Sequence, residues 1–176
     1  MSDRAHIMGI TGWSGSGKTN LILRLLPTLK RQGYSVSTVK HAHHNFEIDN
    51  PGKDSYEHRL AGATEVLISS SSRWALIHEN LDEPEANLNK LLQRMSPTDI
   101  VLVEGYKKEK HPKIEVHRST CGGKLICLDN PSVIAVASDT LLPALHIPVI
   151  NLNNVLEITD FILSHIRMNK FVKGKN

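Results

Sequence analysis

This sequence of 176 residues has no long apolar run, only two cysteines and no recognisable export signal. No apolar stretch approaches the roughly 18 residues that a membrane-spanning helix needs, so we expect no membrane span. The two cysteines, Cys121 and Cys127, are too few for a disulfide framework, and their spacing is not that of a C-x-x-C motif. Because the first residues resemble no signal peptide, we expect a reduced, cytoplasmic protein.

A large excess of charge is also absent, because 21 Lys and Arg stand against 18 Asp and Glu, a formal net charge of +3. That charge is too small to indicate nucleic-acid binding, and it fits a protein whose partners are small anions. The length suits one domain, which we expect to span residues 1–176. Within it, residues 113–130 are a candidate flap and residues 170–176 a frayed basic tail.

Short apolar or β-branched runs alternate with helical stretches, which is typical of an α/β fold with a mostly parallel sheet. We expect strands at residues 6–11, 35–40, 99–104, 113–118, 133–137 and 148–151. Two closely spaced strands, at 64–70 and 73–78, predict an added antiparallel hairpin. Helices are expected at residues 18–32, 55–62, 83–95 and 155–168. Pro27 is unfavourable inside the first helix, by about 3 kcal/mol, but the apolar spacing continues on both sides of it.

The segment G-W-S-G-S-G-K-T, residues 12–19, matches the phosphate-loop motif G-x-x-x-x-G-K-[ST] without a mismatch. A chance match in a chain of this length has a probability of about 1% or less at average composition. The match also lies between a predicted strand and a predicted helix, as the motif requires. We therefore predict a three-layer P-loop NTPase fold that binds a nucleoside triphosphate together with Mg²⁺.

Each residue type in this loop has a chemical reason. Glycines allow backbone N–H groups to point inward at phosphate oxygens, and the following helix adds the positive end of its dipole. Lys18 supplies a positive charge to the β- and γ-phosphates, and the Thr19 hydroxyl is a Mg²⁺ ligand. The expected nucleotide-binding residues of the loop are Gly12, Ser14, Gly15, Ser16, Gly17, Lys18 and Thr19.

A second metal ligand is expected at the end of an apolar strand. Asp99 and Glu104 bracket the strand Ile-Val-Leu-Val, about 16 Å apart, so they cannot share one ion. Glu104 is at the carboxyl end, where ligands of parallel sheets bind, and Asp99 is expected to be a capping or surface residue. Asp49 and Asp54 are further candidates for orienting the metal or a water. Turn and helix-capping roles for these two are equally plausible, because Glu57 follows Asp54 at capping-box spacing.

Three other features have competing interpretations. A zinc site is suggested by His41, His43 and His44. The sequence offers no matching Cys or His pair elsewhere, so we do not expect a structural metal there. Arg73 could reach a phosphate, even across a dimer interface, although an exposed arginine at the start of a strand is the simpler interpretation. Trp74 is expected in the core rather than against a base.

Several segments beyond the loop resemble one known family. They are V-K-H-A-H-H at 39–44, P-G-K-D-S-Y-E at 51–57, A-G-A at 61–63, R-W-A-L at 73–76, L-V-E-G-Y-K at 102–107 and V-I-A-V-A-S-D at 133–139. In this order they are similar to the molybdopterin-guanine dinucleotide biosynthesis protein B family, MobB. The resemblance runs from the first strand to about residue 139 and is weaker over residues 119–130 and the last helix.

This resemblance implies a homodimeric GTP-binding protein with weak GTPase activity. It implies an adapter for the partner guanylyltransferase that attaches GMP to molybdopterin, and not the transferase itself. Carried over by residue, the phosphate contacts fall on Gly15, Gly17, Lys18 and Thr19, and the strand-end acid falls on Glu104. Lys18 and Glu104 are thus the expected catalytic pair, and molybdopterin itself is a possible ligand.

Guanine specificity is not evident from the usual motif. The sequence has no N-K-x-D loop, because Asn89 and Lys90 are followed by two leucines. Asp139 ends a buried strand and could accept from the N1–H and amino group of guanine. A turn-forming Ser-Asp pair is an equally plausible interpretation.

Basic residues crowd one region, in which Glu109 and Glu115 are the only acids. They are Lys107, Lys108, Lys110, His111, Lys113, His117, Arg118 and Lys124. A solvated charged face is the default interpretation. The sharper hypothesis is a flap that receives the phosphate of a pterin cofactor or an acidic partner surface.

Two other function classes use the same phosphate loop. A small-molecule kinase using ATP needs several arginines over the phosphates, and this region offers only Arg118. A metallochaperone-type NTPase would use the histidines of residues 41–44. For the adapter we expect slow hydrolysis, because neither a general base nor an arginine finger in cis is evident.

Overall fold

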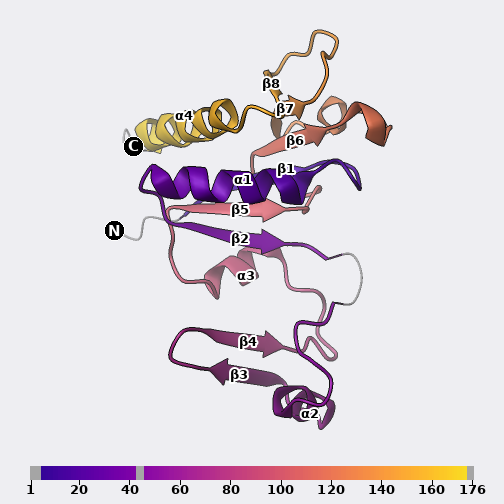
Figure 1. The fold of residues 1–176 in the computed structure, drawn as a ribbon, viewed down its shortest axis with the longest axis vertical. Coiled ribbons are helices and arrows are strands. Elements are labelled where there is room, and N and C mark those ends of the chain that lie inside the picture. Colours follow the sequence, from indigo (N-terminus) through magenta and orange to yellow (C-terminus); the bar gives the residue numbers. More distant parts are fainter. Residues whose placement is uncertain (1–4, 43–45, 174–176) are drawn as a thin grey trace. The chain divides into compact units, whose positions relative to one another are not determined.

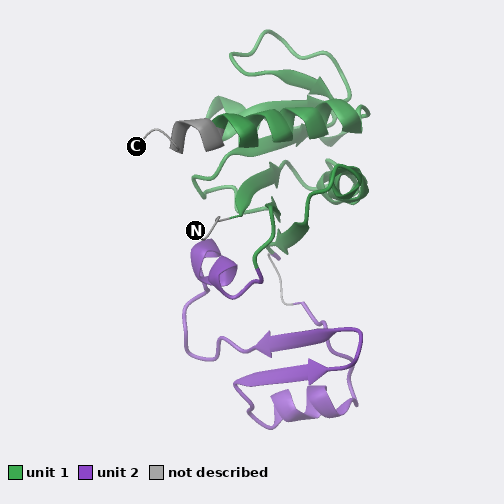
Figure 2. Ribbon diagram, turned by 90° about the vertical axis from the view of Figure 1, so that its left-hand side faces the viewer, with its two compact units in different colours: residues 1–41, 97–176 green, residues 42–96 purple. Residues whose placement is uncertain are grey.

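The structure is a computed structural model that describes residues 5–42 and 46–173. The chain divides into two compact units, residues 1–41 with 97–176 and residues 42–96 (Figure 2). The expectation of a single domain over residues 1–176 stays a prediction, and the two units are described separately.

The first unit contains a six-stranded sheet. Its strands are β1 (His6–Thr11), β2 (Val36–Lys40), β5 (Ile100–Glu104), β6 (Lys113–His117), β7 (Val133–Ser138) and β8 (Val149–Asn151). Their order is β2-β5-β1-β6-β7-β8, and every neighbouring pair is parallel. The carboxyl ends therefore meet at one edge, towards which the arrows point in Figure 1. That edge is where ligands of such sheets bind.

Helices α1 (Lys18–Arg31) and α4 (Val155–Lys173) pack against each other and bury their apolar faces in the core. The core combines the inward residues of the strands with Leu21, Ile22, Leu25, Leu29, Ile158, Ile162, Leu163 and Ile166. Burial of each such side chain contributes about 1.5–3 kcal/mol relative to exposure. Pro27 lies inside α1, which continues through it.

Helix α4 is longer than predicted. It continues to Lys173, past the predicted end at residue 168 and into the segment predicted as a tail. Residues 174–176 lie outside the described part of the chain. Among the residues that the structure describes, no helix combines the length and the apolar character required to cross a membrane.

The second unit contains α2 (Asp54–Leu60), β3 (Glu65–Ser69), β4 (Trp74–His78) and α3 (Leu88–Gln93). Strands β3 and β4 form the predicted antiparallel hairpin. The α/β fold with a mostly parallel sheet and an added hairpin is thus confirmed. The core assignment of Trp74 is wrong, because its side chain is 63% exposed.

Both helices of the second unit begin elsewhere than predicted. The predicted helix 83–95 begins only at Leu88, because the Asn87 side chain caps it by accepting from the Lys90 N–H at 2.9 Å. Pro84 also disfavours helical backbone at Glu83. Helix α2 begins at Asp54, so this carboxylate lies in the first turn near the positive end of the dipole, and no capping box forms.

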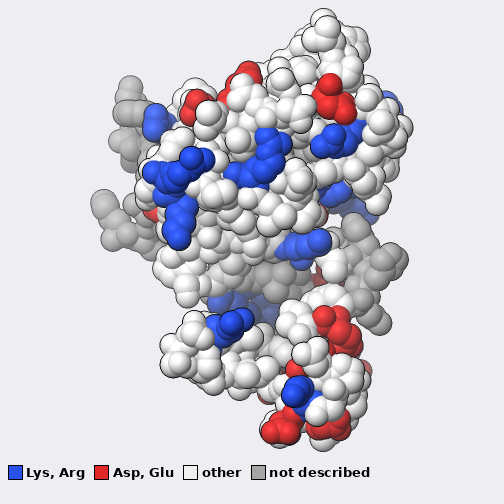
Figure 3. All heavy atoms as spheres, in the orientation of Figure 1, with Lys and Arg blue, Asp and Glu red and all other residues white. Residues whose placement is uncertain are grey.

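The connection between β6 and β7, residues 118–132, forms two 3-10 turns, η1 (Ser119–Cys121) and η2 (Ile126–Leu128). We call it the β6–β7 loop. Figure 3 shows basic side chains along α1 and acidic side chains gathered near α2.

Candidate nucleotide-binding site

The phosphate loop, residues 12–19, connects the carboxyl end of β1 to the first turn of α1. Gly12, Gly15 and Gly17 all have positive φ, at 149°, 78° and 97°. At Gly12 a Cβ would also lie 2.5 Å from the Val116 carbonyl oxygen and 2.6 Å from Ser16 Oγ. Only glycine fits there, so the conformation that turns backbone N–H groups inward is built into the sequence.

Lys18 folds back over the mouth of this loop. Its ammonium donates to the carbonyl oxygens of Trp13, at 2.9 Å, and Gly12, at 3.2 Å. Burial lowers the pKa of Lys18, and the nearby Glu104 carboxylate opposes this shift. A partly desolvated cation held between loop carbonyls is well placed to receive an anion.

Thr19 and Glu104 lie together, as the sequence predicts. Strand β5 pairs with β1 so that Glu104 lies opposite Ile10, and Thr19 Oγ1 donates to Glu104 Oε1 at 2.9 Å. Lys40 at the end of β2 lies 3.8 Å from the same carboxylate oxygen. A hydroxyl and a carboxylate are the hard oxygen donors that Mg²⁺ prefers, so this pair fits the metal.

Two of the other acids have structural partners. Asp99, at the opposite end of β5, accepts from the Ser35 N–H and hydroxyl at 2.7 and 2.6 Å, a capping role as expected. Asp49 accepts from Ser55 Oγ at 2.8 Å and lies 3.8 Å from Arg59. These two interactions lie within the second unit.

Asp54 also belongs to the second unit, so its assignment to the metal stays a prediction. His41 stacks beside Tyr106, with ring centroids 4.7 Å apart, and His43 and His44 lie outside the described residues. Within residues 5–42 and 46–173, no three His, Cys, Asp or Glu side chains are placed to share a metal ion.

On the β6 side of the loop, Arg118 and Asp139 come together. Arg118 Nε donates to the Ser16 carbonyl at 3.2 Å, and Arg118 Nη1 lies 3.8 Å from Asp139 Oδ2. Asp139 Oδ1 also accepts from the Ser119 N–H at 2.9 Å. From the sequence, Arg118 is expected only as one of the basic residues of the candidate flap. The pairing depends on β6 lying between β1 and β7, an order that no local pattern reveals.

Trp13 attaches the phosphate loop to its surroundings. Its indole N–H donates to the Lys124 carbonyl at 2.9 Å, and the Lys107 ammonium lies 4.4 Å from the ring centroid. A Cβ on Gly123 would lie only 2.9 Å from the indole nitrogen, so the β6–β7 loop approaches the ring closely at a glycine. Ser14 is exposed, whereas the Ser16 hydroxyl is buried without a hydrogen-bond partner.

The basic region is not uniformly a charged surface. Lys113 is fully buried, and its ammonium donates to the carbonyls of Glu109 and His111. Glu115 is 1% exposed and accepts from the N–H groups of Ile126 and Cys127, both at 2.8 Å. The interpretation as a solvated face is therefore wrong for these two residues.

Lys108 and Lys110 are exposed, and Lys107 is half-buried against Trp13. Lys124 pairs with Asp129 at 2.8 Å. Lys107, Lys108 and Lys110 thus bring positive charge to the surface shortly after Glu104 and Gly105 in the chain.

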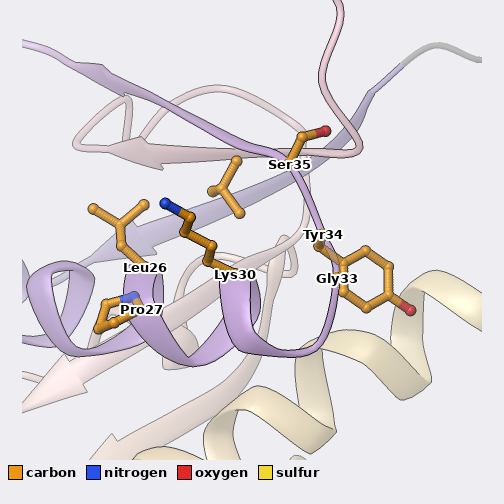
Figure 4. Close-up of a pocket in the computed structure, with 7 residues that line it drawn as sticks. Leu26, Pro27, Lys30, Gly33, Tyr34 and Ser35 are labelled. Carbon is orange, nitrogen blue, oxygen red and sulfur yellow. The ribbon is translucent and has the colours of Figure 1, made fainter.

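A groove of about 600 Å³ lies at the other end of α1, away from the phosphate loop (Figure 4). It is lined by Leu26, Pro27, Lys30, Gly33, Tyr34, Ser35 and Val36. Because α1 begins at the phosphate loop and ends here, the groove is separate from the candidate site.

Comparison with known proteins gives a family. The model of the family described as molybdopterin guanine dinucleotide synthesis protein B, MobB, matches residues 7–139. The molybdopterin-guanine dinucleotide biosynthesis adapter protein of Escherichia coli (strain K12) is 41% identical over 161 residues, 89% of this chain and 91% of that protein. The adapter protein of the same name from Haemophilus influenzae is 38% identical over 164 residues, 92% of this chain and 90% of that protein.

A weaker similarity concerns kinases. A uridine kinase of Leuconostoc citreum is 29% identical over 109 residues, which cover 56% of this chain and 51% of that protein.

Among solved structures, the crystal structure of Bacillus subtilis MobB superposes with a TM-score of 0.71 at 25% identity. The superposition covers 90% of this chain and 96% of that one. The family model matches more than half of the chain and includes the phosphate loop, Glu104 and Asp139. This chain belongs to the MobB family of molybdopterin guanine dinucleotide synthesis proteins.

Proposed function

We propose that this protein binds GTP with Mg²⁺ at the phosphate loop and acts as an adapter in molybdopterin guanine dinucleotide synthesis. The observation that carries the proposal is the hydrogen bond between Thr19 and Glu104, which joins the end of the loop to the end of the neighbouring strand. The names of the curated relatives supply the pathway.

The loop residues divide the work of binding. Backbone N–H groups of residues 15–19 hold the β-phosphate, and Lys18 leaves its two carbonyl partners to neutralise the β- and γ-phosphates. Thr19 and Glu104 hold Mg²⁺, directly or through water, and the metal supplies charge neutralisation of the phosphate oxygens when bound.

Hydrolysis is proposed to be slow. Glu104 already interacts with Thr19 and Lys40, so it is poorly placed to deprotonate a water molecule. Arg118 is held on the other side of the loop by Ser16 and Asp139, away from the developing charge on a γ-phosphate. Asp139 is the proposed reader of guanine. Its Oδ1 accepts from the Ser119 N–H and its Oδ2 lies 3.8 Å from Arg118 Nη1, and each oxygen has a second lone pair for the base.

The partners are a second copy of the chain and the enzyme that attaches GMP to molybdopterin. Leu67, Trp74 and Leu76 lie on one face of the β3–β4 hairpin and are 64%, 63% and 42% exposed, an apolar surface suited to a homodimer. The lysines of residues 107–110 are the proposed contact for a pterin phosphate or an acidic surface of the partner enzyme. We place this function in the cytoplasm.

Nucleotide binding tests the proposal. Calorimetry with Mg²⁺ should give tighter binding of GTP than of ATP to the wild type, and Lys18→Ala should abolish both. Arg31→Ala, which removes a cation at the far end of α1, is the matched control and should bind like the wild type. Preference for ATP, together with phosphoryl transfer to a nucleoside, would instead favour the kinase alternative that the uridine kinase similarity raises.

The role of Glu104 in metal binding is tested separately. The variant Glu104→Gln keeps an oxygen that accepts from Thr19 but removes the negative charge of the carboxylate. The affinity for GTP should then fall about tenfold when Mg²⁺ is present and should not change in EDTA, because only the metal needs the carboxylate. An equal loss in both conditions would show that Glu104 acts on the loop and not on the metal.

A further inference from the structure

Arg118 lies on the side of the phosphate loop opposite to the metal ligands. The loop follows β1, and β5 and β6 flank β1 on its two sides. Glu104 ends β5 and contacts Thr19, whereas Arg118 directly follows β6 and contacts Ser16. The two charged side chains therefore approach the loop from opposite directions.

This arrangement fixes the direction of a bound nucleotide. Thr19 and Glu104 would hold the Mg²⁺ that neutralises the terminal phosphates, so this pair marks the γ-phosphate end of the site. A triphosphate is a linear chain, so the nucleoside leaves the loop on the other side, towards the carboxyl ends of β6 and β7. Arg118 and Asp139 are the first residues after those two strands.

The guanidinium is held by its edge. Nε donates to the Ser16 carbonyl, and Nη1 faces Asp139. A Cβ on Gly17 would lie 3.2 Å from Nε and 3.5 Å from Nη2 but 3.8 Å from Cζ. Gly17 therefore also lies at the edge of the guanidinium and not above its plane. These three neighbours fix the plane of the guanidinium and leave its faces free of hydrogen bonds. The side chain is 34% exposed, so solvent, or a ligand, reaches it.

We infer that Arg118 forms one wall of the nucleoside site, by stacking a face of its guanidinium on the purine ring of the bound nucleotide. Planar, delocalised cations stack on aromatic rings, and a guanidinium held at its edge loses little freedom on doing so. The inference rests on the proposed nucleotide binding and adds to it the residue that contacts the base.

Stacking on a base and binding to a phosphate make different predictions. Arg118→Ala should weaken GTP, GDP and GMP by a similar factor of about ten, while inorganic tripolyphosphate, which has no base, should bind as to the wild type. Arg118→Lys should not restore the affinity for the nucleotides, because its ammonium keeps the charge without the planar face.

The experiment is calorimetry of the four ligands with wild type, Arg118→Ala, Arg118→Lys and Lys18→Ala, with thermal unfolding to verify the fold. Lys18→Ala should lose tripolyphosphate and GTP together, which shows that both ligands use the loop. The inference is overturned if tripolyphosphate weakens in parallel with GTP in Arg118→Ala, or if Arg118→Lys restores binding. Wild-type protein that binds tripolyphosphate but no nucleotide would also overturn it, and protein that binds neither would overturn the proposed function itself.

Discussion

Glu104 and Glu115 are two carboxylates at the same edge of the sheet with opposite roles. Glu104 faces the phosphate loop and accepts from the Thr19 hydroxyl. Glu115, on β6, is buried and uses both oxygens to hold two backbone N–H groups of η2. The difference comes from what lies beyond each strand end, and neither residue alone reveals it.

His111 is a titratable residue of the first unit whose ring nitrogens are buried. Both ring nitrogens are buried and have no hydrogen-bond partner, and the ring and Lys113 fill the space beside Gly9. A Cβ on Gly9 would lie 2.7 Å from His111 Nε2. Burial, and secondarily the charge of Lys113, lowers the pKa of His111 to about 4.

This histidine predicts acid sensitivity. Because its pKa is lower in the folded protein than in the unfolded chain, the unfolded chain takes up the proton first as the pH falls. The stability that His111 contributes is complete above pH 6.5 and is lost as the pH falls towards 4, by about 1–2 kcal/mol once the solvent-accessible part of the ring is allowed for. Urea unfolding at pH 7 and pH 5 measures it.

The comparison variant is His111→Phe, which fills the same space without titrating. Its free energy of unfolding should change less between pH 7 and pH 5 than that of the wild type. The exposed His146 supplies the control, since His146→Gln should retain the wild-type pH dependence. An identical slope in His111→Phe would assign the acid sensitivity to other groups.

At the scale of elements, the β6–β7 loop is attached at several points. Glu115 holds η2, the Asn130 amide donates to the Lys107 carbonyl at 2.8 Å, Trp13 donates to Lys124, Asp139 accepts from Ser119, and Arg118 donates to Ser16. Glu115 belongs to the sheet, and Trp13 and Ser16 belong to the phosphate loop. The loop is therefore an ordered part of the first unit that adjoins the nucleotide site.

Glu115→Gln should loosen this element. An amide offers one acceptor where the carboxylate offers two, and it places a donor against a backbone N–H, so we expect a loss of about 2 kcal/mol in unfolding free energy. The pKa of the Cys127 thiol, raised to about 11 by burial and by Glu115, should fall towards its ordinary value. In a Cys121→Ser background, Cys127 should then react faster with a disulfide reagent at pH 8. Unchanged reactivity would mean that η2 does not depend on Glu115.

Elements with strong local signals were predicted well. The strand at residues 6–11, the phosphate loop and the buried strand before Glu104 are specified by glycines and continuous apolar runs within a few residues. Helix α3 was predicted too long because a helical pattern does not reveal where Asn87 competes as a cap. Burial of Lys113 and Glu115 was missed because it depends on neighbours distant in sequence, including Gly9 and the backbone of η2.

At the scale of the whole molecule, the phosphate loop, Glu104, Arg118 and Asp139 belong to the first unit, while Asp54 and the exposed apolar hairpin belong to the second. From the sequence, Trp74 is expected in the core, because a tryptophan in a strand is usually buried within its own chain. Its exposure is what a surface that pairs with a second copy requires. The family resemblance predicts a dimer, which the apolar pattern of one chain alone does not.

Trp74→Lys tests this interpretation. A charge in an apolar contact should weaken dimerisation at least tenfold, whereas the hairpin itself should remain folded because the side chain is already exposed. Sedimentation velocity over a range of concentrations measures the change. Leu141→Lys, at a 98% exposed position in the first unit, is the matched control and should sediment like the wild type. A Trp74→Lys protein that remains dimeric would place the interface elsewhere.

The two tryptophans of the chain are intrinsic fluorophores in two different places. Trp13 is hydrogen-bonded to the β6–β7 loop, and the Lys107 ammonium lies over its ring, so its emission reports on the phosphate loop. The exposed Trp74 reports on the hairpin. Trp74→Phe leaves an indole signal for ligand binding alone, and Trp13→Phe leaves one for self-association alone. Occupancy of the site and assembly of the protein can thus be followed separately, by light, without any label.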